Sequence, residues 1–261
     1  MKMGSWETIN VSLSDDVLTL TFNRPDRLNA FNPTLSSEFA EAIRLAGQMP
    51  AIRAIVLTGA GRAFCAGGDM TEVRETPANF AEGAVDARNI LFGLLDCEKP
   101  IICRMNGDAI GLGATIALLC DIVIATDSAR IGDPHVKMGL VAGDGGALLW
   151  PMLAGPMVAK YYLLTGDLMP APQAQAHGLI TKAVASAVLD EEVAMITKKL
   201  TEGAPLAIRW TKRSINSYMQ SIGKLQFDLS LGYEGMTLVS EDHAEAIAAF
   251  KAKRKPVFKG R

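Results

Sequence analysis

The sequence predicts an α/β fold with parallel strands at its core. Apolar runs typical of buried strands occur at residues 54–57, 101–103 and 122–125, and segments with helical patterns separate them. Glycine-rich turns follow the first two runs. Strands that alternate with helices in this way favour a parallel sheet.

A β-hairpin is expected before this core. Apolar and polar residues alternate over residues 9–13 and again over residues 18–22, and Ser14-Asp15-Asp16 forms a turn sequence between them. A helix follows, with Asn32 as its N-cap and Pro33 as its first residue. Apolar residues then recur at helical spacing as far as Ala46, and Gly47 is expected to end the helix.

Helices dominate the C-terminal third of the chain. Strand patterns mostly fade after Gly155, and helical patterns cover residues 191–201, 205–219 and 244–250. The junction near Gly203-Ala204-Pro205 therefore divides a core of residues 1–203 from a helical region of residues 204–261. Residues 70–85 are polar and contain Pro77 and Gly83, which predicts an irregular loop beside the site.

Composition favours a soluble enzyme. The 261 residues are 49% hydrophobic, enough to bury a sizeable core in one large domain with or without an appendage. A net charge of −2 favours neither a nucleic-acid partner nor an anionic membrane surface. The longest uncharged apolar stretch, residues 109–120, is too short to span a bilayer, and no secretory signal is apparent.

Four cysteines lie in apolar segments without the CxxC spacing of a metal site. We expect buried, reduced thiols and a cytoplasmic location. The glycine turns match neither a dinucleotide fingerprint nor a Walker loop, and no metal cluster is evident in the sequence.

Two glycine-rich turns about forty residues apart are the most informative feature. The first is Phe64-Cys65-Ala66-Gly67-Gly68-Asp69, and the second runs from Asn106 to Gly113 and opens into an apolar helix. A turn that enters a helix leaves backbone N–H groups unpaired. Two such turns facing each other can direct two donors at one developing oxyanion.

These residues resemble those of the enoyl-CoA hydratase/isomerase (crotonase) family. The resemblance extends over nearly the whole chain and includes both glycine turns and four further segments. The further segments are residues 23–30, Cys120-Asp121, Leu163-Leu164-Thr165-Gly166 and residues 253–258. It implies a spiral of ββα repeats, with a helical C-terminal region that builds a homotrimer or a dimer of trimers. It also implies an acyl-CoA thioester substrate, with no cofactor beyond the CoA that the substrate carries.

Residue by residue, the resemblance assigns the oxyanion donors to the N–H groups of Gly68 and Leu112. Leucine stands at position 112, where the family usually has glycine, and its bulk is expected to narrow or redirect the acyl pocket. Typical hydratases carry one glutamate two residues after the second turn and another about twenty residues later. Thr115 and His135 occupy these positions, so both usual catalytic carboxylates are missing.

Three side chains are candidates for the catalytic role of the missing glutamates, and each also has a structural alternative. Thr115 either holds a water or bonds back to a helix carbonyl. His135 is either an acid–base group, with Asp133 to orient it, or a packed histidine. Asp144 is either a carboxylate base or nucleophile, or the N-cap of the helix that begins at Gly146. Some relatives place a catalytic aspartate one residue earlier, at the position of Gly143.

The resemblance also implies a set of CoA contacts. It assigns them to Arg27, Ala66, Gly68, Asp69 and Lys259, with Lys259 reaching a neighbouring subunit. Asp69 is alternatively a structural residue.

Two functions remain open at this point. The first is an enzyme that stabilises a thioester enolate, with slow turnover of crotonyl-CoA because both glutamates are absent. The second is a protein that binds acyl-CoA without transforming it. A cavity without Asp144 and His135 favours the second. A serine peptidase is disfavoured, because no serine follows either turn in a nucleophile context.

Overall fold

The computed structural model describes residues 6–69 and 77–261 and has an α/β architecture. Its strands are β1 (Ile9–Ser14), β2 (Val17–Phe22), β3 (Ala54–Gly59), β4 (Ile101–Met105), β5 (Ala109–Ile110), β6 (Ile122–Thr126), β7 (Arg130–Gly132), β8 (Met169–Pro170) and β9 (Lys182–Val184). Its helices are α1 (Pro33–Gln48), α2 (Pro77–Asp96), α3 (Leu112–Leu118), α4 (Gly146–Ala154), α5 (Pro156–Thr165), α6 (Ala171–Ala176), α7 (Leu189–Glu202), α8 (Pro205–Leu238) and α9 (Glu241–Lys251).

Six strands form the main sheet in the order β1-β2-β3-β4-β6-β9. β1 and β2 pair antiparallel as the predicted hairpin, and the four other pairs are parallel. β3 lies inside the sheet and is buried at every residue, which explains its continuous apolar sequence. A second sheet has the order β5-β7-β8.

Helix α1 begins as predicted. Asn32 is extended at the N-cap and its side chain accepts a hydrogen bond from the Leu35 N–H at 3.0 Å, while Pro33 is the first helical residue. The helix ends at Gln48, one residue beyond the expected Gly47.

The irregular loop expected over residues 70–85 is wrong for residues 77–85, which form the first turns of α2. Residues 70–76 lie outside the described residues. Polar residues and Gly83 lower the helical propensity of this stretch, but α2 packs against both α1 and α8. Tertiary packing therefore outweighs local preference here.

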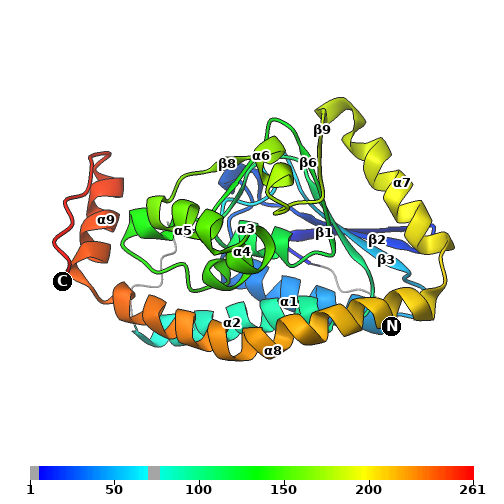
Figure 1. Ribbon diagram of the computed structural model, residues 1–261, viewed down its shortest axis with the longest axis horizontal. Coiled ribbons are helices and arrows are strands. Elements are labelled where there is room, and N and C mark those ends of the chain that lie inside the picture. The colour runs from blue at the N-terminus through cyan, green and yellow to red at the C-terminus, as the bar shows by residue number, and fades with distance from the viewer. Residues whose placement is uncertain (1–5, 70–76) are drawn as a thin grey trace.

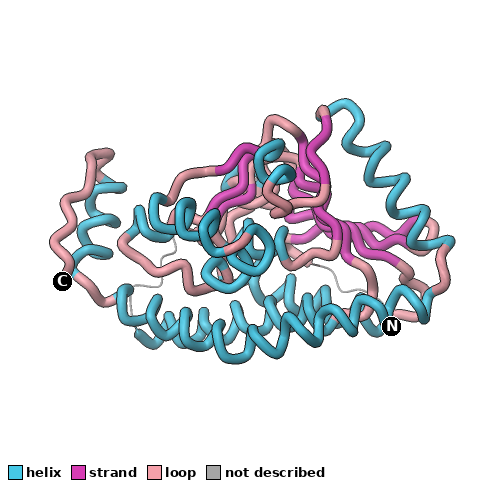
Figure 2. The backbone as a smooth tube through the Cα atoms, viewed as in Figure 1, coloured by secondary structure: helices cyan, strands magenta, loops and turns pink. Residues whose placement is uncertain are grey.

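Helix α8 continues well past the predicted end at residue 219, to Leu238. It runs along one long side of the molecule, below α1 and α2 in the view of Figure 1, and contacts α2 and α4. Figure 2 shows the same helical layer beneath the strands. Buried Gly223 and Phe227 anchor the second half of α8, so its packing stabilises residues with weak helical propensity.

All four cysteines are buried and free, as predicted. Within residues 6–69 and 77–261, no helix is both long and apolar enough to cross a bilayer.

Candidate active site

The two glycine turns lie side by side. Cys65 and Ala109 form a parallel backbone bridge, and the Ile110 N–H donates to the Cys65 carbonyl at 2.9 Å. A Cβ on Gly113 would lie 2.4 Å from the same carbonyl oxygen, so only glycine allows this approach. The backbone pairing thus brings Gly68 and Leu112 to the wall of one cavity.

Both predicted oxyanion donors are available in this cavity. Leu112 is the first residue of α3, so its N–H has no acceptor within the helix. Gly68 is held between two backbone hydrogen bonds, from the Phe31 N–H to the Gly67 carbonyl and from the Asp69 N–H to the Phe31 carbonyl. Across the described parts of the chain, neither the Gly68 nor the Leu112 N–H donates to a protein acceptor.

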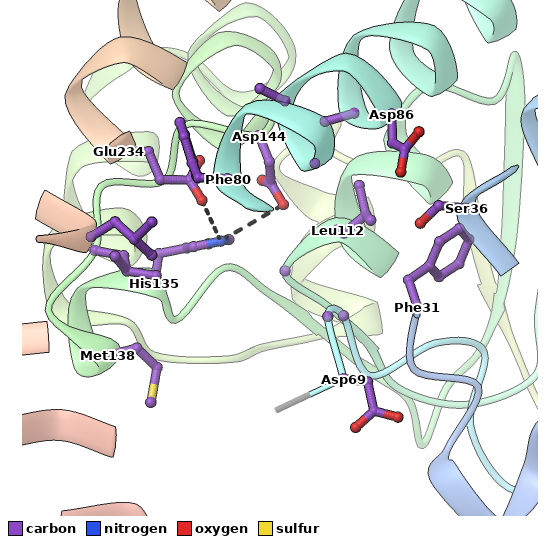
Figure 3. Close-up of a pocket in the computed structure, with 18 of the residues that line it drawn as sticks. Phe31, Ser36, Asp69, Phe80, Asp86, Leu112, His135, Met138, Asp144 and Glu234 are labelled. Carbon is purple, nitrogen blue, oxygen red and sulfur yellow. Dashed lines mark ion pairs between the residues drawn. The ribbon is translucent and has the colours of Figure 1, made fainter. Parts of the chain in front are cut away.

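The cavity has a volume of about 420 Å³ and mostly apolar walls. Helix α2 contributes Phe80 and Ile90, and α8 contributes Leu231 and Leu238. Asp144, His135 and Glu234 bring polar groups to one side of it (Figure 3). An apolar space with a few convergent polar groups is the usual form of a ligand site.

His135 is held by a buried aspartate. Its Nδ1 bonds to Asp133 Oδ1, and its backbone N–H also approaches that oxygen, at 3.4 Å. Asp133 is 1% exposed and follows β7, while His135 begins the 3₁₀ turn η3 (His135–Met138). The chain leaves the extended conformation at this point, so residues two apart face each other and Asp133 orients His135 as expected.

The other ring nitrogen of His135 lies between two carboxyl groups. Nε2 is 3.7 Å from Asp144 Oδ2 and 4.0 Å from Glu234 Oε1. Figure 3 shows the imidazole directed toward the space between Asp144 and Glu234. Three acidic side chains from three segments therefore surround one histidine.

This arrangement makes His135 a strong base. Burial by itself would lower the pKa of His135, but the Asp133, Asp144 and Glu234 carboxyl groups together raise this pKa well above its ordinary value. The ring is therefore an imidazolium at neutral pH.

The two carboxyl groups that flank His135 have different pKa values. Burial raises the pKa of Asp144 to about 6, against the opposing charge of His135. Burial and the nearby Asp144 raise the pKa of Glu234 to about 8. Near pH 7 Asp144 is thus mostly a carboxylate, whereas Glu234 is mostly a neutral acid.

Glu234 is the site residue that the sequence analysis missed. It lies on α8 and lines the cavity, and its side chain packs against Gly143. A Cβ on Gly143 would lie 2.6 Å from Glu234 Oε2, so Glu234 fills the space that a side chain at position 143 would need. The only signal in the sequence was glycine at a position where some relatives carry an aspartate.

The structural alternatives for Asp144 and Thr115 are wrong. Gly145 is the N-cap residue of α4, and no side chain caps this helix. Thr115 Oγ1 is buried and makes no hydrogen bond to a helix carbonyl among the described residues, and its hydroxyl lies close enough to the Asp144 carboxylate to help lower the pKa of Asp144. Asp144 lines the cavity, whereas Thr115 does not.

The predicted CoA contacts divide into two groups. Ala66, Gly68 and Asp69 line the cavity, and Asp69 also pairs with Arg24 at 3.0 Å. Arg27 and Lys259 are exposed and do not belong to the cavity wall.

Asp133, His135 and Asp144 also offer ligand atoms within 4.8 Å of one another, a spacing that would suit a metal ion. No metal motif is visible in the sequence because the spacing of these three residues matches no recognised one. Asp133 and His135 are bonded to each other in this arrangement.

Known proteins share this architecture. The sequence profile of the enoyl-CoA hydratase/isomerase family matches residues 12–261. The 1,2-epoxyphenylacetyl-CoA isomerase of Escherichia coli K12 is 36% identical, with 94% of this chain and 95% of the relative covered. The 2,3-dehydroadipyl-CoA hydratase of the same organism is 35% identical, with 96% and 98% covered.

A solved structure of an enoyl-CoA hydratase/isomerase from Mycobacterium paratuberculosis superposes with a TM-score of 0.87 at 35% identity. The match covers 92% of this chain and 97% of that protein. It confirms the expected crotonase-like fold.

The raised pKa of Glu234 predicts a stability that falls with rising pH. Between about pH 5 and 8 the folded protein holds the Glu234 proton and the unfolded chain does not, so Glu234 lowers the free energy of unfolding by up to about 1.4 kcal/mol per pH unit. We expect Glu234→Gln to make this slope shallower in urea titrations across that range, and the raised pKa values of Asp144 and His135 to leave a smaller slope of the same sign. Glu191→Gln, at an exposed position on α7, is the matched control and should keep the wild-type slope. An unchanged slope in Glu234→Gln would contradict the assignment.

Proposed function

The chain belongs to the enoyl-CoA hydratase/isomerase family, and we propose that it is an acyl-CoA enzyme that shifts a proton within an enolised thioester. In this proposal Asp144 removes a proton from a carbon activated by the thioester. Glu234 gives a proton to a different carbon of the same acyl group, and Asp144 and Glu234 then regain their starting protonation states by exchange with solvent. The net reaction is a double-bond isomerisation, with no change in the atoms of the substrate.

One observation carries this proposal. Asp144 and Glu234 flank the same imidazole in the cavity, with pKa values of about 6 and about 8. Two groups whose environments push their pKa values to opposite sides of neutrality form a base and an acid at the same pH. His135, oriented by Asp133, lies between them and stabilises the Asp144 carboxylate.

The Gly68 and Leu112 N–H groups supply the other half of the proposed mechanism. An α-proton of a thioester is weakly acidic, and its removal places negative charge on the carbonyl oxygen. Two fixed donors at that oxygen stabilise the enolate without reorganisation during the reaction. In this proposal the buried Thr115 hydroxyl, which helps lower the pKa of Asp144, supports the Asp144 carboxylate or holds a water.

The cavity supports an enzyme over a passive acyl-CoA binder. Asp144 and His135, whose absence would favour a binder, both line the cavity. Thr115 and His135 replace the usual glutamate pair, so we keep the expectation of slow crotonyl-CoA hydration.

We further propose that CoA contacts Ala66, Gly68 and Asp69 at the cavity and the exposed Arg27 and Lys259 through its phosphates. Residues 1–203 would form the core that carries the oxyanion donors, Asp144 and His135. The helical region of residues 204–261 would serve self-association and also contribute Glu234 to the site.

Replacement of the proposed base tests the function most simply. We expect Asp144→Asn to lower kcat for conversion of 3-enoyl-CoA to 2-enoyl-CoA by about 10²–10⁴-fold, because amide nitrogen is not basic. The wild-type kcat/KM should be bell-shaped, rising near pH 6 as Asp144 ionises and falling near pH 8 as Glu234 loses its proton. Asp127→Asn, at an exposed position, is the control. Wild-type turnover in Asp144→Asn would rule out this role.

A second substitution removes an oxyanion donor without removing a side-chain function. Leu112 is the first residue of α3, a position that tolerates proline, so Leu112→Pro deletes the N–H and preserves the helix. We expect kcat to fall by about 10²–10³-fold. Leu112→Ala retains the N–H and should stay much closer to wild type; equal losses in the two variants would refute the donor role.

Self-association as a trimer or a dimer of trimers is supported by exposed apolar side chains on two helices. Met157 and Leu164 on α5 and Trp210 and Leu225 on α8 are each at least 60% exposed. Light scattering should give about three or six times the 27.9 kDa chain mass. A monomer at micromolar concentration would contradict this assignment.

A further inference from the structure

His243 is a second histidine at the cavity that the proposed proton transfer does not use. It lies in the first turn of α9, is 4% exposed and belongs to the cavity wall. Its backbone N–H donates to the side chain of Ser240, the N-cap residue of α9, at 3.1 Å. The position of the ring is therefore tied to the start of this helix.

The contacts of the ring determine which of its two nitrogens carries the hydrogen in the neutral form. Nδ1 is 2.7 Å from the Met138 carbonyl oxygen. A carbonyl only accepts hydrogen bonds, so Nδ1 carries the hydrogen. In the neutral ring Nε2 then has a lone pair and can only accept.

That acceptor has no partner. Among the described residues, nothing donates to His243 Nε2, although the atom is buried. Met138, Leu140 and Leu238, which share this part of the cavity wall, have apolar side chains. A buried acceptor without a hydrogen bond is costly, and a ligand that brings a donor would remove this cost.

We propose that His243 Nε2 accepts a hydrogen bond from a hydroxyl group on the acyl part of the ligand. This inference rests on the proposed acyl-CoA function. The acyl group, rather than CoA, is the favoured source of this hydroxyl, because α9 packs on η3, the turn that also carries His135. His243 therefore lies against the same turn that carries His135, at its Met138 end. The proposed CoA contacts Ala66 and Asp69 belong to the opposite glycine turn.

Binding measurements test this selectivity independently of turnover. Calorimetry at pH 8 would compare 3-hydroxybutyryl-CoA with butyryl-CoA, and 6-hydroxyhexanoyl-CoA with hexanoyl-CoA, with free CoA as the reference. We expect the wild type to bind the hydroxylated member of at least one pair about 10-fold more tightly. The preference should fall to about 1-fold in His243→Leu and return in part in His243→Gln, whose amide oxygen can accept. His177→Leu, at an exposed position, is the matched control.

Three results would overturn the inference. The first is the absence of a preference by the wild type in either pair, and the second is a preference that persists in His243→Leu. A third contrary result is an equal loss of affinity for free CoA and for every acyl-CoA in His243→Leu. This result would assign the hydrogen-bond donor to CoA. If no acyl-CoA binds the wild type, the proposed function fails together with the inference, whereas binding without preference rejects the inference alone.

Discussion

The buried ion pair between Asp133 and His135 is the interaction on which the chemistry of this site depends. It fixes the imidazole, keeps it protonated, and thereby places a positive charge between Asp144 and Glu234. Without that charge, burial would drive both carboxyl groups toward their neutral forms. With it, the closer group, Asp144, is the stronger acid, while Glu234 holds its proton. A base and an acid therefore coexist at neutral pH.

In the proposed mechanism the backbone supplies the remaining requirement, a fixed place for the thioester oxygen. The pairing of the two glycine turns depends on the close approach of Gly113 to the Cys65 carbonyl. The same pairing brings to the cavity wall the N–H groups of Gly68 and Leu112, which have no acceptor among the described residues. Helix α8 then closes that side and contributes Glu234, so the C-terminal helices take part in the site as well as in packing.

Local patterns predicted much of this structure. The hairpin, the start of α1, the parallel sheet and the neighbouring glycine turns all follow from spacing, capping and turn residues. The beginning of α2 and the second half of α8 did not, because tertiary packing stabilises stretches of weak helical propensity. Glu234 was missed for a related reason. A glutamate in a long amphipathic helix looks solvent-exposed, and its burial arises from contact with Gly143, which lies 91 residues earlier in the chain.

Hydrogen exchange at the α-carbon of a saturated acyl-CoA reports enolate formation on its own, since such a ligand can be enolised but not isomerised. The protein would be incubated with butyryl-CoA in D₂O, and deuterium uptake followed by mass spectrometry. We expect uptake at the α-carbon with the wild type and almost none with Asp144→Asn. Tight binding of butyryl-CoA without any uptake in the wild type would contradict enolate formation at this site.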